Sequence, residues 1–267
     1  MLSPITSRNH EVVKRFRKLS RRSHRDRHGL FMVEGLNLVS EGIDSGARLV
    51  ELAYIDSKSE EAAYLRTRLD EHVPMHEISR QLMDWISDAV TAQGIVGVME
   101  QVDASCEKVL SQDNSLLLVA DQVRDPGNLG ALLRIADAAA VDAFVMTAGC
   151  VDPYNPKVVR SAAGAHFHVP LVREVDFERL RGELGRRVRM LGLDAHGENC
   201  YLDEDLTRPV AVVVGNEAFG IPDTDRPCLD GMIRILMPGK AESLNVASAA
   251  AVVLFEALRQ RRDGCGS

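Results

Sequence analysis

Through the first hundred residues, short apolar runs alternate with segments in which apolar residues recur every three or four positions, as on one face of a helix. The stretch before residue 28 carries four apolar side chains on one helical face and predicts a helix, with the stripe formed by Val12, Val13, Phe16 and Leu19. After it the pattern predicts a short strand and then a helix that ends near Gly46. Strands predicted at 49–56, 73–78 and 94–102 then alternate with helices predicted at 59–72 and 79–88, which Ser59 and Ser79 would cap. This alternation predicts a small α/β domain.

The rest of the chain repeats the alternation with more apolar strands. Residues 116–123 form a continuous apolar run, as is typical of a central parallel strand. Further segments predict strands at 142–148, 167–172, 188–195, 208–214 and 232–237, and helices at 155–165, 176–187 and 247–258. Residues 125–141 predict a loop that leads into a helix. We therefore expect an open parallel sheet covered by helices on both faces.

Residues 103–115 are polar and lack strong periodicity, so they predict a boundary between two domains. We expect an N-terminal domain over residues 1–105, a linker at about 106–114 and a C-terminal domain over 115–267. No apolar run reaches the length of a membrane span, and the N-terminus is basic where a signal segment would be apolar. These features predict a cytoplasmic protein that makes no membrane contact.

Charge is distributed unevenly, and this changes the expected partner. The chain carries a net charge of −7, yet residues 8–27 hold nine basic and two acidic residues. A cationic segment on an acidic protein favours a polyanion such as nucleic acid, although a solvated basic helix is the alternative. The candidate phosphate contacts are Arg15, Arg17, Lys18, Arg21 and Arg22, with Arg160 as a weaker one. The five scattered cysteines include no C-x-x-C pair, which argues against disulfides and against a metal site.

Three polar, glycine-containing loops follow predicted strands, at residues 121–134, 214–220 and 236–245. Ligands of open α/β sheets bind at the carboxyl ends of strands, so three such loops predict one shared pocket. The loops contain neither G-x-x-x-x-G-K-[ST] nor G-x-G-x-x-G, which weakens the kinase, NTPase and dehydrogenase interpretations.

The same three loops resemble the motifs of the SpoU, or TrmH, family of RNA ribose 2′-O-methyltransferases. NLGALLR resembles the first motif, VVVGNEAFGIP the second, and ILMPGKAESLNVASAAAV the third, in the family's order over residues 115–262. The N-terminal stretch FMVEGLNLVSEGIDSGARLVELAYID resembles the ribosomal-protein-like RNA-binding domain that often precedes this enzyme. Ala218 departs from the pattern, since the family often has glycine there, and this matters only if φ is positive.

The resemblance implies a C-terminal α/β domain with a deep trefoil knot, a feature that general topology rules treat as rare. It also implies S-adenosylmethionine as cofactor and a homodimer packed through the knotted part. The residues that it assigns to the cofactor are Thr147, Val214, Gly215, Asn216, Ile235, Met237 and Leu244.

Catalytic roles are likewise assigned by the resemblance, with Arg134 as the catalytic arginine. Because arginine is effectively always protonated, we expect it to hold phosphate and stabilise a developing alkoxide instead of acting as a base. Asn128, Glu217, Ser243 and Asn245 complete the candidate set. Each also has a purely structural interpretation: Asn128, Ser243 and Asn245 as helix caps, Glu217 as a solvated acid, and Arg134 as an ion-pair partner of Asp125 or Asp137.

The resulting hypothesis is an S-adenosylmethionine-dependent RNA 2′-O-methyltransferase that acts on ribosomal RNA. Transfer RNA as substrate, methylation of a base nitrogen, a catalytically silent ribosome-assembly factor and an antibiotic-resistance enzyme are the alternatives. Trimming residues 1–28 is predicted to weaken RNA binding and flatten its salt dependence while leaving cofactor binding intact.

Overall fold

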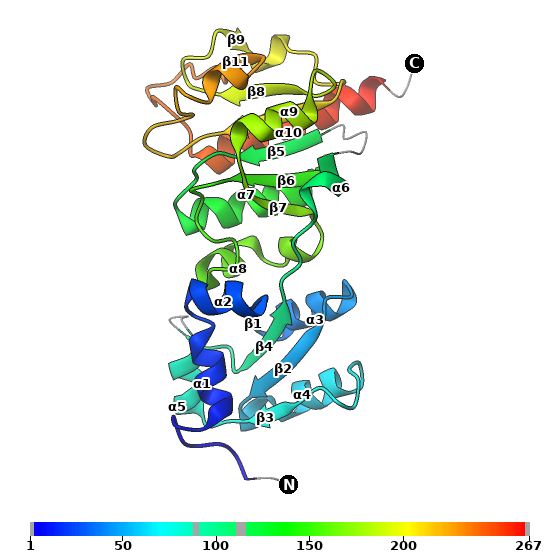
Figure 1. Ribbon diagram of the computed structural model, residues 1–267, viewed down its shortest axis with the longest axis vertical. Coiled ribbons are helices and arrows are strands. Elements are labelled where there is room, and N and C mark those ends of the chain that lie inside the picture. The colour runs from blue at the N-terminus through cyan, green and yellow to red at the C-terminus, as the bar shows by residue number, and fades with distance from the viewer. Residues whose placement is uncertain (1–2, 88–90, 111–115, 265–267) are drawn as a thin grey trace. The chain divides into compact units, whose positions relative to one another are not determined.

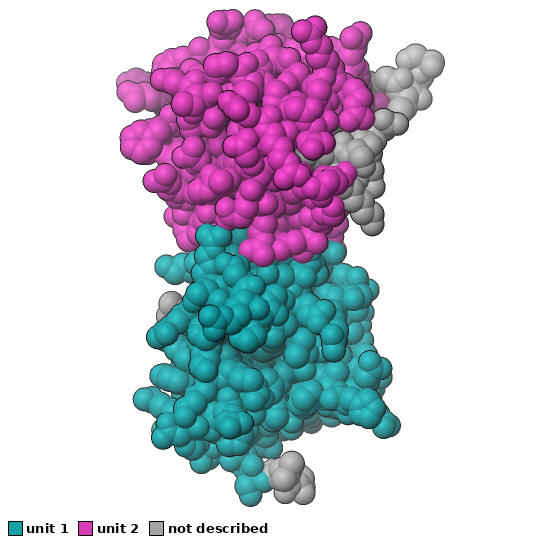
Figure 2. Space-filling model, in the orientation of Figure 1, with its two compact units in different colours: residues 1–102, 152–167 teal, residues 103–151, 168–267 magenta. Residues whose placement is uncertain are grey.

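The computed structural model describes residues 3–87, 91–110 and 116–264, and the chain divides into two compact units. Unit 1 comprises residues 1–102 and 152–167, and unit 2 comprises 103–151 and 168–267 (Figure 2). The segment 152–167 therefore packs with the first unit, although its place in the sequence lies inside the expected C-terminal domain. Of the expected linker, residues 111–114 lie outside the described residues, and α6 (Cys106–Leu110) precedes them.

Unit 1 is built on a mixed sheet with the strand order β1-β4-β2-β3 (Figure 1). Its strands are β1 (Leu30–Glu34), β2 (Leu49–Tyr54), β3 (Met75–Glu77) and β4 (Ile95–Glu100). β4 runs antiparallel to β1 and β2, whereas β3 is parallel to β2. The helices are α1 (Glu11–Lys18), α2 (Arg22–His28), α3 (Leu36–Asp44), α4 (Ser59–Arg66), α5 (Arg80–Ile86) and α8 (Pro156–Ala162).

The basic N-terminal segment is part of the core of unit 1. Its predicted apolar stripe is confirmed, since Val12, Val13, Phe16 and Leu19 are all buried and pack with α5 against the sheet. The single predicted helix is instead two, because the chain turns between α1 and α2 at Leu19–Arg21. Trimming residues 1–28 would thus remove core side chains as well as charge, and the role of the charge needs point substitutions.

Arg25 departs most clearly from the expectation of a cationic surface. It is 2% exposed, and its guanidinium Nε lies 2.9 Å from Oδ2 of Asp152. The same guanidinium donates to the carbonyl oxygens of Leu19 and Ser20, each at 2.8 Å. Arg25 therefore joins α2 to the segment 152–167 inside unit 1 and is unavailable to a polyanion.

Unit 2 contains the expected parallel sheet, with the order β7-β6-β5-β10-β8-β11-β9 (Figure 1). The strands are β5 (Leu116–Ala120), β6 (Ala143–Thr147), β7 (Leu171–Val175), β8 (Arg189–Leu193), β9 (Asn199–Cys200), β10 (Val210–Val214) and β11 (Gly231–Arg234). All five residues of β5, β6 and β10 are buried, as continuous apolar runs predict for central strands.

Helices cover both faces of this sheet. α6 and α9 (Phe177–Leu184) share one apolar cluster with the side chains of Leu117 and Val119. α7 (Pro126–Ala138) and α10 (Val246–Gly264) pack against each other, and they also contact β6 and β10 respectively. Because α7 and α10 both begin at the carboxyl edge of the sheet, their first turns bring the first and third motif loops to one place.

Several local predictions are corrected by the structure. Ser79 caps α5 by accepting from the Leu82 amide, as predicted, but Ser59 is the first residue of α4 and makes no capping bond. The strand expected at 167–172 begins only at Leu171, since a 3₁₀ turn occupies Ala165–Phe167. The two-residue strand β9 carries too short a pattern to be predicted. No helix among the described residues is long and apolar enough to cross a membrane.

Candidate active site

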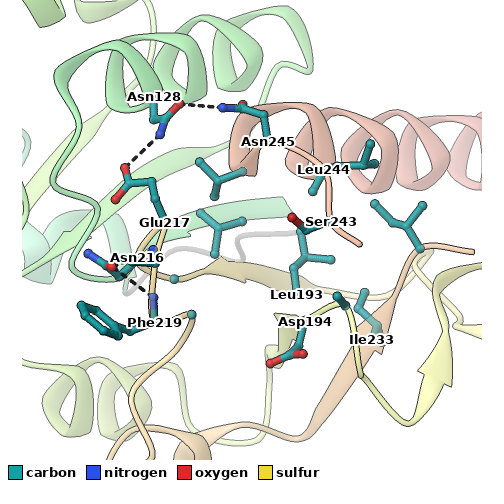
Figure 3. Close-up of a pocket in the computed structure, with 18 of the residues that line it drawn as sticks. Asn128, Leu193, Asp194, Asn216, Glu217, Phe219, Ile233, Ser243, Leu244 and Asn245 are labelled. Carbon is teal, nitrogen blue, oxygen red and sulfur yellow. Dashed lines mark hydrogen bonds between the residues drawn. The ribbon is translucent and has the colours of Figure 1, made fainter. Parts of the chain in front are cut away.

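A cavity of about 570 Å³ opens at the carboxyl edge of the unit 2 sheet (Figure 3). Residues of all three motif loops line it, including Asn128, Glu217 and Ser243. The shared pocket follows from the parallel sheet, because parallel strands present their carboxyl ends along one edge. Of the seven residues that the resemblance assigns to the cofactor, six line this cavity: Val214, Gly215, Asn216, Ile235, Met237 and Leu244.

A chain of hydrogen bonds joins the three loops at the mouth of the cavity (Figure 3). The Asn245 amide donates to Oδ1 of Asn128 at 2.8 Å, and the Asn128 amide donates to Oε1 of Glu217 at 3.1 Å. The Glu217 carboxylate also accepts from the backbone amides of Arg124 and Asp125. One carboxylate and two amides thus fix the loops relative to one another within unit 2.

The charge state of Glu217 follows from these contacts. Partial burial acts to raise the pKa of Glu217, but the hydrogen bonds from Asn128 and from the backbone amides outweigh it and lower the pKa. The carboxylate is therefore ionised at neutral pH, and its two oxygens accept from three donors. Glu217 is thus an exposed acid whose carboxylate is held in place by three hydrogen bonds.

Two helices begin at this site, each with its own cap. Asp125 is the N-cap of α7 and accepts from the Asn128 amide, so Asn128 stands in the first turn and its side chain is left for Glu217 and Asn245. Asn245 caps α10, since its Oδ1 accepts from the amides of Ala247 and Ser248. Asn245 therefore caps the helix and also bonds Asn128 at the cavity, and Ser243 lines the cavity without capping the helix.

The second motif forms a tight turn whose backbone allows little change. Gly215 could not carry a side chain, because a Cβ there would lie 2.2 Å from the carbonyl carbon of Gly220. Gly220 itself has a φ of 69°, which favours glycine. Ala218 does not have a positive φ, so the departure from the family's glycine introduces no backbone strain.

Thr147 lies away from the cavity, in contrast to its assigned cofactor role. It is buried at the end of β6, where its hydroxyl donates to Oδ1 of Asp121 at 2.7 Å and accepts from the Gln122 amide. Burial, together with the nearby Asp225 carboxylate, raises the pKa of Asp121 to about 6, although the bond from Thr147 opposes the shift. Thr147 thus helps to hold the backbone of the first motif loop.

Arg134 projects from α7 outside the cavity lining. Its side chain is exposed, and within the described part of the chain it forms no ion pair with Asp125 or Asp137. It follows Asn128 by six residues, which corresponds to about 9 Å along a helix axis. Arg134 therefore lies outside the lining of the cavity, farther along α7 than Asn128.

The sequence interpretation missed one whole wall of the cavity. Leu193, Asp194 and Ala195 line it from the end of β8, and Asp194 pairs with Arg226 at 3.1 Å. The sequence predicts a strand at 188–195, and ligands bind at the carboxyl ends of parallel strands. The sequence does not show that this strand, β8, lies beside β10, so it gave no reason to place the end of β8 at the cavity. Phe219, in the second motif, also lines the cavity but was not identified as a candidate site residue from the sequence.

The candidate RNA-binding side chains lie on unit 1 and differ in their surroundings. Arg15 pairs with Glu51, and Arg22 pairs with Asp26 one helical turn away. Arg17 lies over the Trp85 ring, 5.4 Å from its centroid. Arg160 is half-buried in the last turn of α8, whereas Lys18 and Arg21 are exposed, at the end of α1 and just before α2.

Comparison with known proteins decides the family. The sequence model of the SpoU rRNA Methylase family matches residues 115–255, and that of the MRM3-like substrate binding domain matches residues 10–97. The chain belongs to the SpoU rRNA methylase family. The first match contains all three motif loops and the whole hydrogen-bonded chain from Asn245 to Glu217.

Curated SpoU relatives resemble the protein over nearly its full length. The 23S rRNA (uridine(2479)-2′-O)-methyltransferase of Streptomyces viridochromogenes is 32% identical over 97% of this chain and 93% of its own. The 23S rRNA (guanosine(2553)-2′-O)-methyltransferase RlmP of Bacillus subtilis is 31% identical over 95% of this chain and 98% of its own.

Solved SpoU structures share the fold. The methyltransferase AviRb from Streptomyces viridochromogenes, crystallised with the cofactor AdoMet, superposes with a TM-score of 0.87 at 28% identity over 95% of this chain and 99% of its own. The AdoMet-bound rRNA methyltransferase from Sinorhizobium meliloti superposes with a TM-score of 0.84 at 31% identity, over 96% of this chain and 97% of its own. The predicted fold, a small N-terminal α/β domain followed by the parallel-sheet domain of this knotted family, is confirmed.

Proposed function

We propose that the protein is an S-adenosylmethionine-dependent methyltransferase that modifies a ribose 2′-hydroxyl in ribosomal RNA. The observation that carries the proposal is the convergence of three motif loops on one cavity, joined by the bonds Asn245–Asn128–Glu217. Membership of the SpoU rRNA methylase family and the names of the relatives support this reaction and this substrate. We place the activity in the cytoplasm, where relatives of this kind would meet ribosomes.

The cavity fits the cofactor in size and in chemistry. Its volume of about 570 Å³ lies within the range of roughly 300–1,000 Å³ that is usual for small-molecule sites. Val214, Ile235 and Leu244 offer apolar walls for a purine, while the Asp194 carboxylate provides a polar group for the sugar or the amino-acid portion. When bound, S-adenosylmethionine supplies an activated methyl group on a sulfonium.

The remaining task of the protein is to orient the ribose and to assist loss of the hydroxyl proton. Asn128 and Asn245 hold fixed amide orientations at the cavity mouth, because Asn245 donates to Asn128 and Asn128 donates to Glu217. Arg134 lies farther along α7 and presents a permanently charged fork to an RNA phosphate. We propose that this charge stabilises the developing alkoxide, and that the proton leaves through phosphate or water.

We further propose a homodimer packed through the knotted part, as the family resemblance implies. Unit 2 keeps large apolar side chains at its surface, with Leu236 56% and Phe255 49% exposed. Burial of such side chains stabilises an interface. Sedimentation is expected to give twice the chain mass of 29.3 kDa, and a single-chain mass would contradict the dimer.

The reaction is tested by methyl transfer from labelled S-adenosylmethionine to ribosomal RNA and to ribosomal particles from a strain lacking the gene. One 2′-O-methylated nucleotide, mapped by nuclease digestion and mass spectrometry, is expected. Transfer to transfer RNA alone would correct the substrate. Absence of both transfer and cofactor binding would instead identify an RNA-binding factor without catalysis.

Substituting Glu217 is expected to loosen the cavity mouth. Glu217→Ala removes the acceptor for three donors, and hydrogen bonds to charged groups contribute about 1.5–3 kcal/mol each. Because the Glu217 side chain is partly solvated, we expect a loss near the lower limit, about a tenfold weaker affinity for S-adenosylmethionine by calorimetry. The pKa of Glu217 is lowered in the folded state. The stabilisation by its charged hydrogen bonds is therefore fully present above pH 4.5, the ordinary pKa of the carboxyl group, and is lost as the pH falls through the lowered pKa.

The matched control for this substitution is Glu198→Ala, which alters an exposed acid of unit 2 that does not line the cavity. Its affinity is expected to equal that of the wild type. An unchanged affinity in Glu217→Ala would show that the loops keep their arrangement without the carboxylate.

The exposed cations Lys18, at the end of α1, and Arg21, just before α2, are expected to contribute phosphate contacts. Each phosphate contact steepens the dependence of log K on log salt by about 0.7–0.9, so Lys18→Gln with Arg21→Gln is expected to reduce the slope by about 1.4–1.8. Anisotropy titrations of an rRNA fragment at several salt concentrations measure it. The pair Arg48→Gln and Arg68→Gln, which removes equal charge from residues bonded to Glu100 and Asp44, serves as control. Equal flattening by both pairs would contradict a local role.

A further inference from the structure

Phe219 differs from every other phenylalanine of the chain in its exposure. It is 83% exposed, whereas Phe16, Phe31 and Phe144 are completely buried and Phe255, the next most exposed, is at 49%. A large apolar side chain in water contributes nothing to the core, so packing gives no reason for a phenyl ring at this position. The ring stands at the rim of the cavity, where Phe219 is one of the lining residues.

The turn that carries Phe219 is fixed by its own hydrogen bonds. Oδ1 of Asn216 accepts from the amides of Ala218 and Phe219, at 3.0 and 3.3 Å. The backbones of Asn216 and Gly220 exchange two bonds, of 2.8 and 2.9 Å, and the Asn216 amide donates to the Gln122 carbonyl at 3.0 Å. The hydrogen-bonded turn therefore fixes the backbone that carries the ring, and this lowers the entropy lost when a ligand packs on the ring.

Neighbouring side chains of the turn face different ways. The Glu217 carboxylate reaches toward Asn128, while Figure 3 shows the Phe219 ring directed away from the side chains of Leu193, Asp194 and Ile233. The ring thus borders the cavity without facing its far wall. A ligand that touches this ring must extend out of the cavity toward solvent, as the substrate does and the cofactor need not.

We propose that Phe219 is a positioning residue that stacks on the base of the nucleotide whose ribose enters the cavity. This inference rests on the proposed function, because a ribose at the cavity mouth places its base outside the cavity. Proteins that read unpaired RNA stack its bases on aromatic side chains, which hold the nucleotide without selecting it by hydrogen bonds. The Asn128 and Asn245 amides would then orient the ribose while the ring fixes the base.

The test is steady-state methyl transfer to ribosomal RNA by Phe219 variants. Phe219→Ala is expected to lower kcat/KM for RNA by about 5- to 100-fold, mainly through KM, because loss of one aromatic stack weakens binding by this amount. The affinity for S-adenosylmethionine is expected to stay unchanged. Phe219→Tyr and Phe219→Trp are expected to retain activity, whereas Phe219→Leu, which is apolar but not aromatic, is not.

A direct signal comes from fluorescence. Trp85 is the only tryptophan of the chain, so Phe219→Trp in a Trp85→Phe background places a single indole at the rim. Addition of the RNA substrate is expected to quench it, and S-adenosylmethionine alone is not. Leu202→Ala, which removes an apolar side chain that is 53% exposed and does not line the cavity, should behave as the wild type.

The outcomes separate this inference from the proposed function. A wild type that transfers methyl groups together with an equally active Phe219→Ala would overturn the stacking role and leave the function intact. Full activity in Phe219→Leu would also overturn it, since bulk alone would then suffice. If the sedimenting mass falls in Phe219→Ala, the ring contacts a second copy of the chain and the inference is wrong. If the wild type transfers no methyl group, the proposed function fails, and quenching by RNA alone decides whether the ring stacks on a base.

Discussion

Arg134→Lys is expected to lower kcat for methyl transfer by about 10²- to 10³-fold, the loss typical when one donor to a developing oxyanion is removed. Lysine keeps the charge but not the planar fork that grips a phosphate with two parallel bonds. Because Arg134 lies outside the cavity lining, the affinity for S-adenosylmethionine is expected to remain that of the wild type. Single-turnover methyl transfer and calorimetric titration of the cofactor measure the two quantities separately.

Two results would contradict this role of Arg134. Full turnover in Arg134→Lys would show that charge alone suffices, and a parallel loss of cofactor affinity would place the defect in folding or in the cavity. Arg186→Lys, at an exposed position of unit 2 outside the cavity, is the matched control and is expected to retain full activity.

Asp152→Ala is expected to destabilise unit 1 by about 3–5 kcal/mol, because it leaves the Arg25 guanidinium buried without its counter-ion. Both side chains are at most 5% exposed. Asp152 also accepts from the Tyr154 amide at 2.9 Å, so its loss frees a second buried donor. Trp85 belongs to unit 1, and its fluorescence during urea unfolding of the full chain therefore reports on this unit.

The double variant separates the cost of an unpaired charge from the value of the ion pair. Arg25→Met combined with Asp152→Ala is expected to recover part of the loss, since no charge is then left buried. The exposed pair Arg22–Asp26 is the control, and Asp26→Ala is expected to cost less than about 1 kcal/mol. An equally small cost for Asp152→Ala would show that water reaches Arg25.

This ion pair also bears on how the protein is organised. Asp152 follows β6 of unit 2 in the sequence, yet it is bonded to Arg25 of α2, within unit 1. The segment 152–167 adds buried Tyr154 and His166 to the same unit, and burial lowers the pKa of His166 to about 4. One stretch between two strands of the catalytic sheet is therefore a structural part of the other unit.

The sequence alone determined the features that depend on local pattern. Continuous apolar runs identified the central strands β5, β6 and β10, and helical spacing identified the buried face of α1. The three motif loops were found because glycine, asparagine and acidic residues after apolar strands stand out against a regular pattern. These signals survive without tertiary information, because strand and helix periodicity is a property of neighbouring residues.

Only the tertiary structure decided which residues meet. Nothing near Arg25 in the sequence distinguishes it from the exposed Lys18 and Arg21, since its burial depends on Asp152, 127 positions away. Thr147 bonds Asp121 instead of lining the cavity, and Asp194 enters the cavity because β8 lies next to β10. Partners distant in sequence are brought together by the order of strands in the sheet, and that order is set by the packing of the whole chain. The sequence thus determined the elements and the motifs, and the tertiary structure decided which side chains form the site.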